Sequence, residues 1–429
     1  MPSPRRVNTA RVTLWGMPLG AVAWDEGKAL GSFQYENSFI ASGLGPAPLK
    51  MPLGPAIYSF PELNRATFRG LPGLLADALP DRFGNAVIEQ WLRSKRRDPA
   101  GFSPIERLCY VGTRAMGALE FHPALAGLRP DVGSLEVDEL RDFAARVLAA
   151  KDKVSARLRQ KDLATLIRIG TSAGGARAKA ILAWNPETNE VRSGDGTLAK
   201  GFEPWIMKFD GVKDDLVGDP EGFGRLEYVY HLMATDAGID MSPCRLFEEG
   251  PRAHFMTRRF DRAGDGAKIH MQSFCALRHF DFNAAGAYSY EQLMDTALSL
   301  KLGAKALDQL ARRMIFNLVA RNQDDHTRNF AFLMDRSGQW RLAPAFDIIW
   351  SHNPVGTWTA RHQMTVNGKS SEFSVKDLEA ALKPYGIKRF KAVLEEVVGA
   401  VAKWPALAKK HGVPRDLVKQ VGNSHRMKW

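Results

Sequence analysis

Apolar and polar residues alternate over short segments in the first 125 residues of the chain, a pattern typical of β-strands rather than long helices. Two such strand patterns lie at 11–15 and 21–24, and the glycine- and proline-containing segment between them predicts a β-hairpin. The apolar run at 12–24 follows several arginines, as in a secretory signal, but two glycines and a proline interrupt it. We therefore expect a hairpin there.

Longer segments repeat apolar residues at helical spacing, which indicates amphipathic helices. These segments are 74–97, 137–148, 226–237 and 307–319. We expect the first to break near Pro80, because proline removes a helical hydrogen bond. The cationic run at 93–97 is typical of a solvated helix end, and a contact with a partner or DNA is the less favoured interpretation. The last segment is apolar on one face over three turns, which indicates a buried helix.

Strand patterns, a linker and a helical region divide the rest of the chain. Strands are predicted at 179–184, 204–209 and 254–260, and a hairpin from the patterns 330–334 and 339–343. A linker-like stretch at 122–133 contains two prolines and two glycines. We place the main domain boundary there, with a β-rich domain at 1–125 and a second domain at 126–429. The region 375–418 is mainly helical, with breaks expected near Pro384, Pro405 and Pro414.

Composition places the chain among soluble globular proteins. Of its 429 residues, 45% are hydrophobic and 25% are charged, which excludes a disordered, collagen-like or coiled-coil chain. No apolar stretch reaches about 18 residues, so we expect no transmembrane helix. The three cysteines lie far apart without a CxxC motif, which suits a reducing cytoplasm. The net charge of +12 permits, without requiring, binding to nucleotides or nucleic acid.

The densest group of polar residues is Arg321–Asn329, directly after the predicted buried helix. Catalytic groups are common on loops that rigid elements hold in place. Asp324 and Asn329 have the spacing D-x-x-x-x-N, which in protein kinases places a base and a metal ligand on one loop. We therefore predict Asp324 as the catalytic base and Asn329 as a Mg²⁺ ligand. Either residue alone would be better explained as part of a surface turn.

A further carboxylate, Asp347, follows the hairpin predicted at 330–343. A kinase carries its second Mg²⁺ ligand after such a hairpin, so that the chain doubles back to the metal. Mg²⁺ prefers hard oxygen ligands, with nucleotide phosphates completing its shell. The ordered set Asp324, Asn329 and Asp347 therefore favours a functional site over a surface turn.

Kinase chemistry also needs a phosphate cradle and a cation. The small residues of Ile169–Lys179 would let backbone N–H groups approach phosphate oxygens. Because Ala-Arg stands where a Walker loop needs Lys and Ser/Thr, a plain strand turn is about as good an interpretation. Lys208, inside an apolar strand, is predicted to bridge nucleotide phosphates, with Glu227 on the next helix as its ion-pair partner. Taken singly, a solvent-facing lysine is the simpler interpretation of Lys208.

The end of the third predicted strand is rich in arginine. The Arg-Phe-Asp-Arg sequence at 259–262 predicts an ion-pair network, whereas the backbone near Arg258 and Phe260 is a candidate contact to adenine at a hinge. His326 either contacts phosphate or is a hydrogen-bonded loop residue, and the sequence leaves both open.

Taken together, these motifs resemble those of the HipA family of bacterial toxin kinases, and the resemblance covers almost the whole chain. The N-terminal part contributes Leu79-Pro80-Asp81. The later motifs are Ser-x-Gly-Gly-x-x-x-Lys at Ser172–Lys179, Lys208 in its strand, Arg259–Arg262, Asp324–Asn329 and Pro344–Asp347.

The resemblance implies an α+β fold, namely a two-lobed protein-kinase-like fold of the HipA type. It would have a small β-rich N-terminal domain, kinase N-lobe elements to about residue 262, and a mostly helical C-terminal lobe at 263–429. It implies ATP- and Mg²⁺-dependent phosphorylation of protein serine or threonine, with Asp324 as base and Asn329 and Asp347 as metal ligands. The implied nucleotide contacts are Ala173, Gly174, Gly175, Ala176, Arg177, Ala178, Lys179, Lys208, Arg258, Phe260, His326 and Phe346.

Partners and regulation are also implied by the resemblance. Family members phosphorylate an aminoacyl-tRNA synthetase, glutamyl in the best-known case, which stops translation and induces a dormant, antibiotic-tolerant state. A HipB-type helix-turn-helix antitoxin that binds operator DNA neutralises them. Ser172 matches the serine that these kinases autophosphorylate, and Thr171 is a competing acceptor. A phosphate there would eject the loop and close the ATP site, because its charge cannot coexist with nucleotide phosphates.

Three alternatives stay open at this point. A small-molecule kinase would be favoured by an acidic substrate cleft. A catalytically silent DNA-binding regulator would need a helix-turn-helix pattern, which the basic segments do not show. A metal phosphoesterase built on Asp324–His326 would need more histidine or carboxylate ligands than the local sequence supplies.

Overall fold

The computed structural model describes residues 6–125, 133–149, 177–194, 196, 198–212 and 221–429. The chain forms two compact units. The first comprises Met1–Glu221, Phe247–Gln272 and Met334–Gly338, and the second comprises Gly222–Leu246, Ser273–Leu333 and Gln339–Trp429. The domain boundary predicted near residue 125 stays a prediction. The loop of small residues at 173–176 lies outside the described residues.

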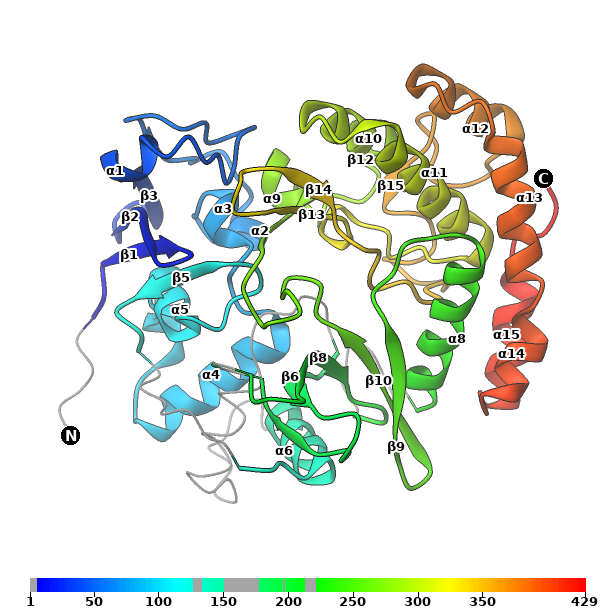
Figure 1. Cartoon of the computed structure of the whole chain (residues 1–429), viewed down its shortest axis with the longest axis horizontal. Coiled ribbons are helices and arrows are strands. Elements are labelled where there is room, and N and C mark those ends of the chain that lie inside the picture. Colours follow the sequence, from blue (N-terminus) through cyan, green and yellow to red (C-terminus); the bar gives the residue numbers. More distant parts are fainter. Residues whose placement is uncertain (1–5, 126–132, 150–176, 195, 197, 213–220) are drawn as a thin grey trace. The chain divides into compact units, whose positions relative to one another are not determined.

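The first unit opens with a five-stranded sheet in the order β4-β3-β2-β1-β5 (Figure 1). Its strands are β1 (Thr9–Leu14), β2 (Met17–Asp25), β3 (Leu30–Tyr35), β4 (Ile57–Tyr58) and β5 (Leu119–His122). The predicted hairpin is confirmed, since β1 and β2 pair antiparallel. Its turn is tighter than expected, because only Trp15 and Gly16 connect the strands. Both have positive φ, 52° and 81°, as the tightest hairpin turns require.

Helices lie in the chain between the later strands of this sheet and after its last strand. They are α1 (Asn37–Ile40), α2 (Arg65–Phe68), α3 (Gly73–Ala76), α4 (Arg82–Ser94), η1 (Pro99–Gly101), α5 (Pro104–Val111) and α6 (Val137–Ala149). The break expected near Pro80 is confirmed, because α3 ends before it and α4 begins after it. Asp81 caps α4 by accepting a hydrogen bond from the Gly84 N–H at 2.8 Å.

A second sheet of the first unit has the order β7-β6-β8-β10-β9, with β9 belonging to this unit from Phe247 onward. Its strands are β6 (Lys179–Trp184), β7 (Val191–Ser193), β8 (Glu203–Lys208), β9 (Cys244–Glu249) and β10 (Arg252–Arg258), and β11 (His270–Ser273) follows in the chain. The three strands predicted here are confirmed to within two residues. One face of the sheet and the helices α4 and α6 share an apolar core that includes Val87, Leu140 and Met207.

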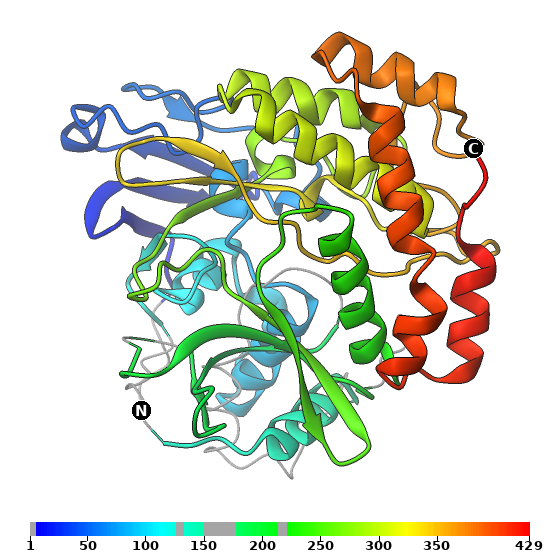
Figure 2. The same ribbon diagram turned by 45° about the vertical axis from the view of Figure 1, so that its right-hand side comes forward.

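The second unit is mostly helical. Its helices are α8 (Phe223–Asp236), α9 (Phe274–Arg278), α10 (Tyr290–Ser299), α11 (Gly303–Ala320), η2 (Thr327–Asn329), α12 (Val375–Leu382), η3 (Lys383–Tyr385), α13 (Phe390–Val401), α14 (Trp404–Lys410) and α15 (Arg415–Ser424). Its strands are β12 (Tyr288–Ser289), β13 (Ala331–Met334), β14 (Trp340–Leu342) and β15 (Met364–Thr365). Helix α13 packs against both α11 and α8 (Figure 2). The breaks expected near Pro384, Pro405 and Pro414 are confirmed, because α12 gives way to η3, α13 ends at Val401 and α14 ends at Lys410. Pro405 lies in the first turn of α14 and Pro414 caps α15, where no N–H donor is needed.

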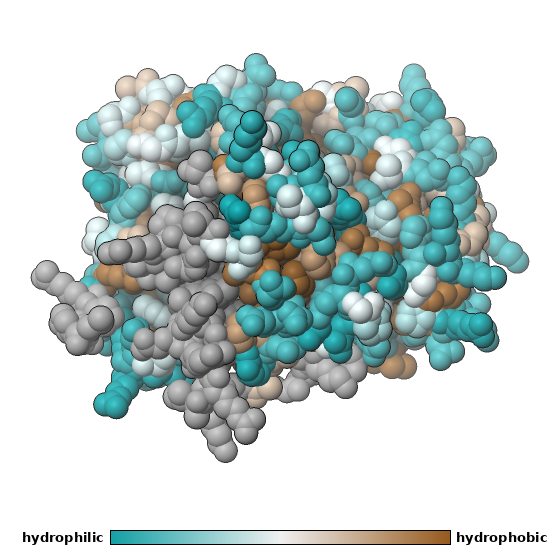
Figure 3. Space-filling view, turned by 60° about the horizontal axis from the view of Figure 1, so that its bottom comes forward, coloured by the Kyte–Doolittle hydropathy of each residue, from teal (hydrophilic) through white to brown (hydrophobic). Residues whose placement is uncertain are grey.

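Most of the apolar side chains are buried. On the face drawn in Figure 3, hydrophilic residues predominate, with hydrophobic patches between them. Within the described ranges, the large hydrophobic side chains that stay exposed are Met17, Ile57, Leu298, Val355 and Met427. None of the helices described is long and apolar enough to span a bilayer.

A buried ion cluster joins distant parts of the first unit. The Asp261 carboxylate is completely buried and accepts hydrogen bonds from Arg259 and Arg262, at 2.8 and 2.7 Å, and from the Gly117 N–H, at 2.8 Å. The predicted ion-pair network is therefore confirmed. Burial by itself would raise the pKa of Asp261, but the two guanidinium charges hold that pKa well below its usual range.

We expect Asp261→Asn to lower the free energy of unfolding by about 3–5 kcal/mol, because it leaves two buried guanidinium groups without their anion. The folded-state pKa of Asp261 lies below the unfolded-state value, so this stabilisation is complete above about pH 5 and is lost as the pH falls below about 4. Urea unfolding at pH 7 and pH 3 measures both effects. The exposed Glu187→Gln is the control, expected within about 0.5 kcal/mol of the wild type. An equal cost at both pH values would contradict this account.

Candidate active site

The segment after α11 is fixed by backbone hydrogen bonds on both sides. Helix α11 is buried along most of its length and is capped by Arg321, whose φ of 56° turns the chain sharply. The Gln323 N–H donates to the Ser351 carbonyl at 3.1 Å, and the Ser351 N–H donates to the Arg321 carbonyl at 3.0 Å. The predicted buried helix is confirmed, and it presents the polar segment as a rigid loop.

Asp325 ties this loop to two other segments of the second unit. The carboxylate is almost fully buried. Its Oδ2 accepts from the Tyr290 hydroxyl at 2.7 Å and lies 2.8 Å from His362 Nδ1, while Oδ1 accepts from the Gln363 N–H at 2.8 Å. Burial and the neighbouring carboxylate raise the pKa of Tyr290, so its hydroxyl keeps the proton that it donates.

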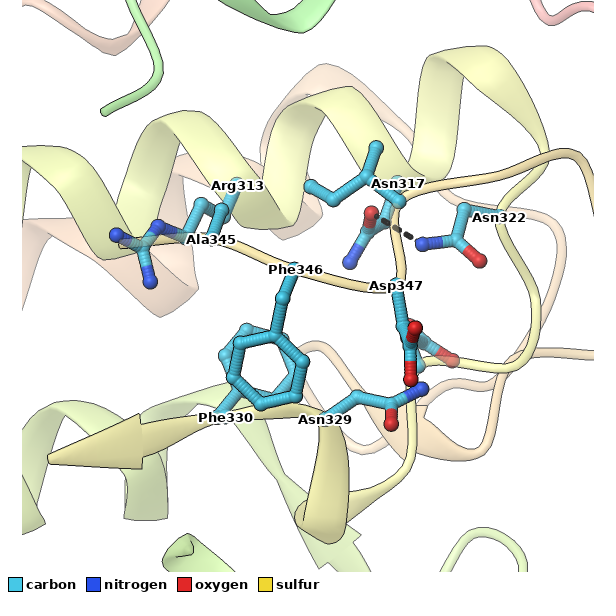
Figure 4. A pocket seen from close by; sticks show the side chains of 10 residues that line it. Arg313, Asn317, Asn322, Asn329, Phe330, Ala345, Phe346 and Asp347 are labelled. Carbon is cyan, nitrogen blue, oxygen red and sulfur yellow. Dashed lines mark hydrogen bonds between the residues drawn. The ribbon is translucent and has the colours of Figure 1, made fainter. Parts of the chain in front are cut away.

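A line of side-chain amides extends this network along α11. Asn317 Nδ2 donates to the Tyr290 hydroxyl at 2.9 Å, and Asn322 Nδ2 donates to Asn317 Oδ1 at 3.0 Å (Figure 4). Asparagine inside a buried helix is costly unless its amide is hydrogen-bonded. Here the amides connect the helix to the loop that follows it.

Asp324 and Asn329 lie on the same turn of the loop. Asn329 Nδ2 donates to the Asp324 main-chain carbonyl at 2.8 Å, which leaves the Asn329 amide oxygen available to a ligand. The Asp324 side chain is 39% exposed, in contrast to its buried neighbour Asp325. The structure therefore places a solvent-accessible carboxylate beside an oriented amide.

Asp347, the second predicted Mg²⁺ ligand, also lies in the second unit. It follows β13 and β14, so the predicted hairpin is confirmed, and its φ of 52° is unusual for a residue other than glycine. Asp347 and Asn329 line one pocket, and their side-chain ends point toward one another in Figure 4. The other lining residues are Arg313, Asn317, Asn322, Asp325, Phe330, Ala345, Phe346 and Ile348.

The ligand chemistry of this pocket fits a hard divalent cation. One carboxylate and one amide oxygen are ligands that Mg²⁺ accepts, and it usually keeps water or phosphate in its remaining positions. In the described part of the chain, no group of three or more His, Cys, Asp or Glu side chains forms a metal-binding arrangement. Asn329 and Asp347 would hold the ion in a partial protein shell.

Two of the predicted nucleotide-binding lysines face each other across strands of the first unit. Lys179 on β6 is the direct cross-strand partner of Lys208 on β8. Lys179 is only 3% exposed, and its Nζ lies 3.6 Å from Asp81 Oδ2. Lys208 Nζ lies 5.6 Å from the centroid of the Phe255 ring. Like charges in direct cross-strand register are unfavourable, so the buried Asp81 carboxylate offsets one of them.

The remaining predicted nucleotide contacts are placed as follows. In the first unit, Arg258 ends β10 with its guanidinium 3.5 Å from Glu203, Phe260 is partly buried just beyond, and Arg177 and Ala178 precede β6. In the second unit, Phe346 lines the pocket, and His326 Nε2 lies 3.8 Å from Asp324 Oδ1. Thr171, Ser172 and residues 173–176 lie outside the described residues.

Glu227 and Lys208 belong to different units. Glu227 is almost fully buried on α8 in the second unit, whereas Lys208 lies in the first. Their proposed ion pair therefore stays a prediction.

Two further side chains contribute to the site without any motif in the sequence. The segment 358–363 supplies Trp358, whose indole Nε1 donates to Asp324 Oδ1 at 2.6 Å, and His362, which contacts Asp325. No motif marks this segment. The asparagine inside the buried helix, Asn317, was the one available signal that a buried polar network lies nearby.

Comparisons with known proteins agree with this architecture. A model described as the HipA N-terminal domain matches residues 10–122, and a model described as the HipA-like C-terminal domain matches residues 171–404. A solved HipA from the toxin–antitoxin system of Shewanella oneidensis MR-1, in a complex with HipB and operator DNA, has a TM-score of 0.64. It is 15% identical, and the match covers 96% of this chain and 95% of that chain.

Two proteins of Sinorhizobium fredii, each named "Putative kinase", also match. Y4dM is 21% identical over 80% of this chain and 77% of its own length. Y4mE is 24% identical over 62% of this chain and 63% of its own length. Because the C-terminal family model spans more than half of the sequence, the chain belongs to the HipA family. The expected α+β fold of the HipA type, with its β-rich N-terminal part, is confirmed.

We expect Tyr290→Phe to lower the free energy of unfolding by about 1–3 kcal/mol, because it leaves the buried Asn317 amide and the Asp325 carboxylate each one hydrogen bond short. Thermal or urea unfolding measures the loss. Tyr385→Phe, which removes a partly exposed hydroxyl, is the matched control and should cost about 1 kcal/mol or less. Equal losses in the two variants would show that the Asp325 network adds no special stability.

Proposed function

We propose that this HipA-family protein is an ATP- and Mg²⁺-dependent serine/threonine protein kinase and the toxin of a HipBA-like toxin–antitoxin system. The observation that supports this most is that Asn329 and Asp347 line one pocket while Asp324 lies on the same loop turn as Asn329. A base and two oxygen ligands on adjoining segments are the parts that phosphoryl transfer needs from a kinase.

The proposed reaction assigns one task to each group of residues. The substrate hydroxyl oxygen forms a bond to the γ-phosphorus of ATP, the bond from that phosphorus to the bridging oxygen breaks, and ADP leaves. Asp324 orients the hydroxyl and accepts its proton. Asn329 and Asp347 would hold Mg²⁺, which would supply positive charge to neutralise the phosphate oxygens.

We also assign part of nucleotide binding to lysine side chains and main-chain groups of the first unit. Lys208 and Lys179 stand in cross-strand register, which is unfavourable unless an anion lies near both. Asp81 supplies one negative charge, and phosphate oxygens would supply more. The loop 173–179 is assigned to phosphate binding, Arg258 and Phe260 to contact with the base, and His326 and Phe346 to contact with the nucleotide. Glu227 is assigned as the ion-pair partner of Lys208.

Partners follow from the solved relative and from the family. The Shewanella oneidensis HipA was solved with HipB and operator DNA, which supports a HipB-like helix-turn-helix antitoxin and operator DNA as partners of this chain. For the protein substrate we propose an aminoacyl-tRNA synthetase, with the glutamyl enzyme as the first to test. Its phosphorylation in the cytoplasm would inhibit translation and promote persistence.

Self-inhibition is assigned to Ser172, with Thr171 as the competing acceptor. A phosphate on this residue would bring about two negative charges to the loop proposed to bind nucleotide phosphates. Because like charges repel, the loop would leave the site.

The test is the intact mass of the full chain before and after incubation with Mg²⁺ and ATP, for the wild type and for Asp324→Asn. The protein is first treated with a phosphatase, so that both start unphosphorylated. We expect the wild type to gain one phosphoryl group located at Ser172 or Thr171, and Asp324→Asn to gain none, because it lacks the base.

Each result has a distinct meaning. If the folded wild type gains no phosphate but releases ADP in the presence of a synthetase, self-inhibition is wrong and the kinase assignment stands. If it neither gains phosphate nor binds ATP, the kinase assignment is wrong.

A further inference from the structure

The exposed carboxylate of Asp324 is held by one aromatic side chain. Trp358 Nε1 donates to Asp324 Oδ1 at 2.6 Å, a short hydrogen bond. His326 Nε2 lies 3.8 Å from the same oxygen, which is too far for a hydrogen bond. The Asp324 side chain is 39% exposed, so the carboxylate is reachable from solvent while Oδ1 is occupied.

The turn that carries Trp358 is anchored to the buried network. Gln363 Nε2 donates to the main-chain carbonyls of Trp358 and Arg361, at 2.5 and 3.1 Å. The N–H of the same residue donates to Asp325 Oδ1 at 2.8 Å. Gln363 is 2% exposed, so these bonds are shielded from water. One buried residue therefore links the carboxylate of Asp325 to the indole that holds Asp324.

The chemistry of indole limits what Trp358 can do. Its N–H is a donor only, so it cannot take a proton from Asp324 or pass one on. With Oδ1 held, the second oxygen, Oδ2, is left to accept the proton of an incoming hydroxyl.

We propose that Trp358 is a positioning residue of the kinase, whose indole N–H fixes the Asp324 carboxylate so that Oδ2 faces the substrate hydroxyl. This inference rests on the proposed function, since it assigns a role relative to Asp324 as the base. Orientation of a reacting group by a fraction of an ångström is worth about tenfold to a hundredfold in rate. The indole is expected to raise the rate of transfer and to leave ATP affinity unchanged.

The test compares Trp358→Phe with the wild type. Phenylalanine keeps an aromatic ring in the turn and removes the donor. The measurement is ADP formation from Mg²⁺·ATP over a range of ATP concentrations, together with the thermal unfolding temperature. We expect the maximal rate to fall at least tenfold, while the half-saturating ATP concentration stays within twofold and the unfolding temperature is nearly unchanged.

Two further variants separate positioning from folding. Trp429 is also partly exposed, and its indole donates to a main-chain carbonyl, that of Arg426, at 2.9 Å. Trp429→Phe therefore loses an equivalent bond away from Asp324 and should keep the wild-type rate. Gln363→Met keeps the backbone N–H bond to Asp325 but removes the donors that hold the Trp358 turn. It should lower the maximal rate in the same direction as Trp358→Phe.

The results that would overturn the inference are specific. A Trp358→Phe rate equal to that of the wild type, with Asp324→Asn inactive, would show that the indole does not position the base. A faster Trp358→Phe enzyme would show that the indole blocks the carboxylate instead. Equal losses in Trp358→Phe and Trp429→Phe would reveal only a folding effect. A fully active Asp324→Asn would instead refute the proposed function itself.

Discussion

The position of the candidate site loop in the second unit depends on one buried carboxylate, that of Asp325. An isolated charge of this kind would be costly, so it persists only because each of its oxygens is hydrogen-bonded. The donors come from Tyr290 at the start of α10 and from His362 and Gln363 on a distant segment. Satisfying Asp325 therefore fixes these two segments against the loop that carries Asp324.

In this arrangement, the aspartate that stabilises the loop is not the aspartate that is accessible to a substrate. Of two adjacent aspartates, one is buried and fully hydrogen-bonded, and the other is exposed and held through a single oxygen. The same loop turn orients the Asn329 amide through the Asp324 main chain, and the hairpin returns Asp347 to the shared pocket. Buried carboxylates also stabilise the first unit. Asp261 accepts hydrogen bonds from arginines, and Asp81 forms an ion pair with Lys179.

Much of the fold could be predicted from the sequence, because apolar periodicity reports directly which face of an element is buried. Helix α11 and strands β6, β8 and β10 follow from that pattern. The turn at Trp15–Gly16 was predicted too long, because tryptophan in a left-handed conformation has no sequence signal. Trp358 was missed for a different reason. It meets Asp324 only through contacts between residues far apart in the chain, and a single sequence carries no record of such pairs.

The central claim is that Asn329 and Asp347 form, with nucleotide phosphates, a Mg²⁺ site. It is tested most directly by titration calorimetry of a non-hydrolysable ATP analogue into the wild type and Asp347→Asn, each with and without Mg²⁺. The account predicts that Mg²⁺ tightens binding at least tenfold in the wild type and has little effect in the variant. Equal affinity with and without Mg²⁺ in the wild type, or an undiminished Mg²⁺ effect in the variant, would contradict it.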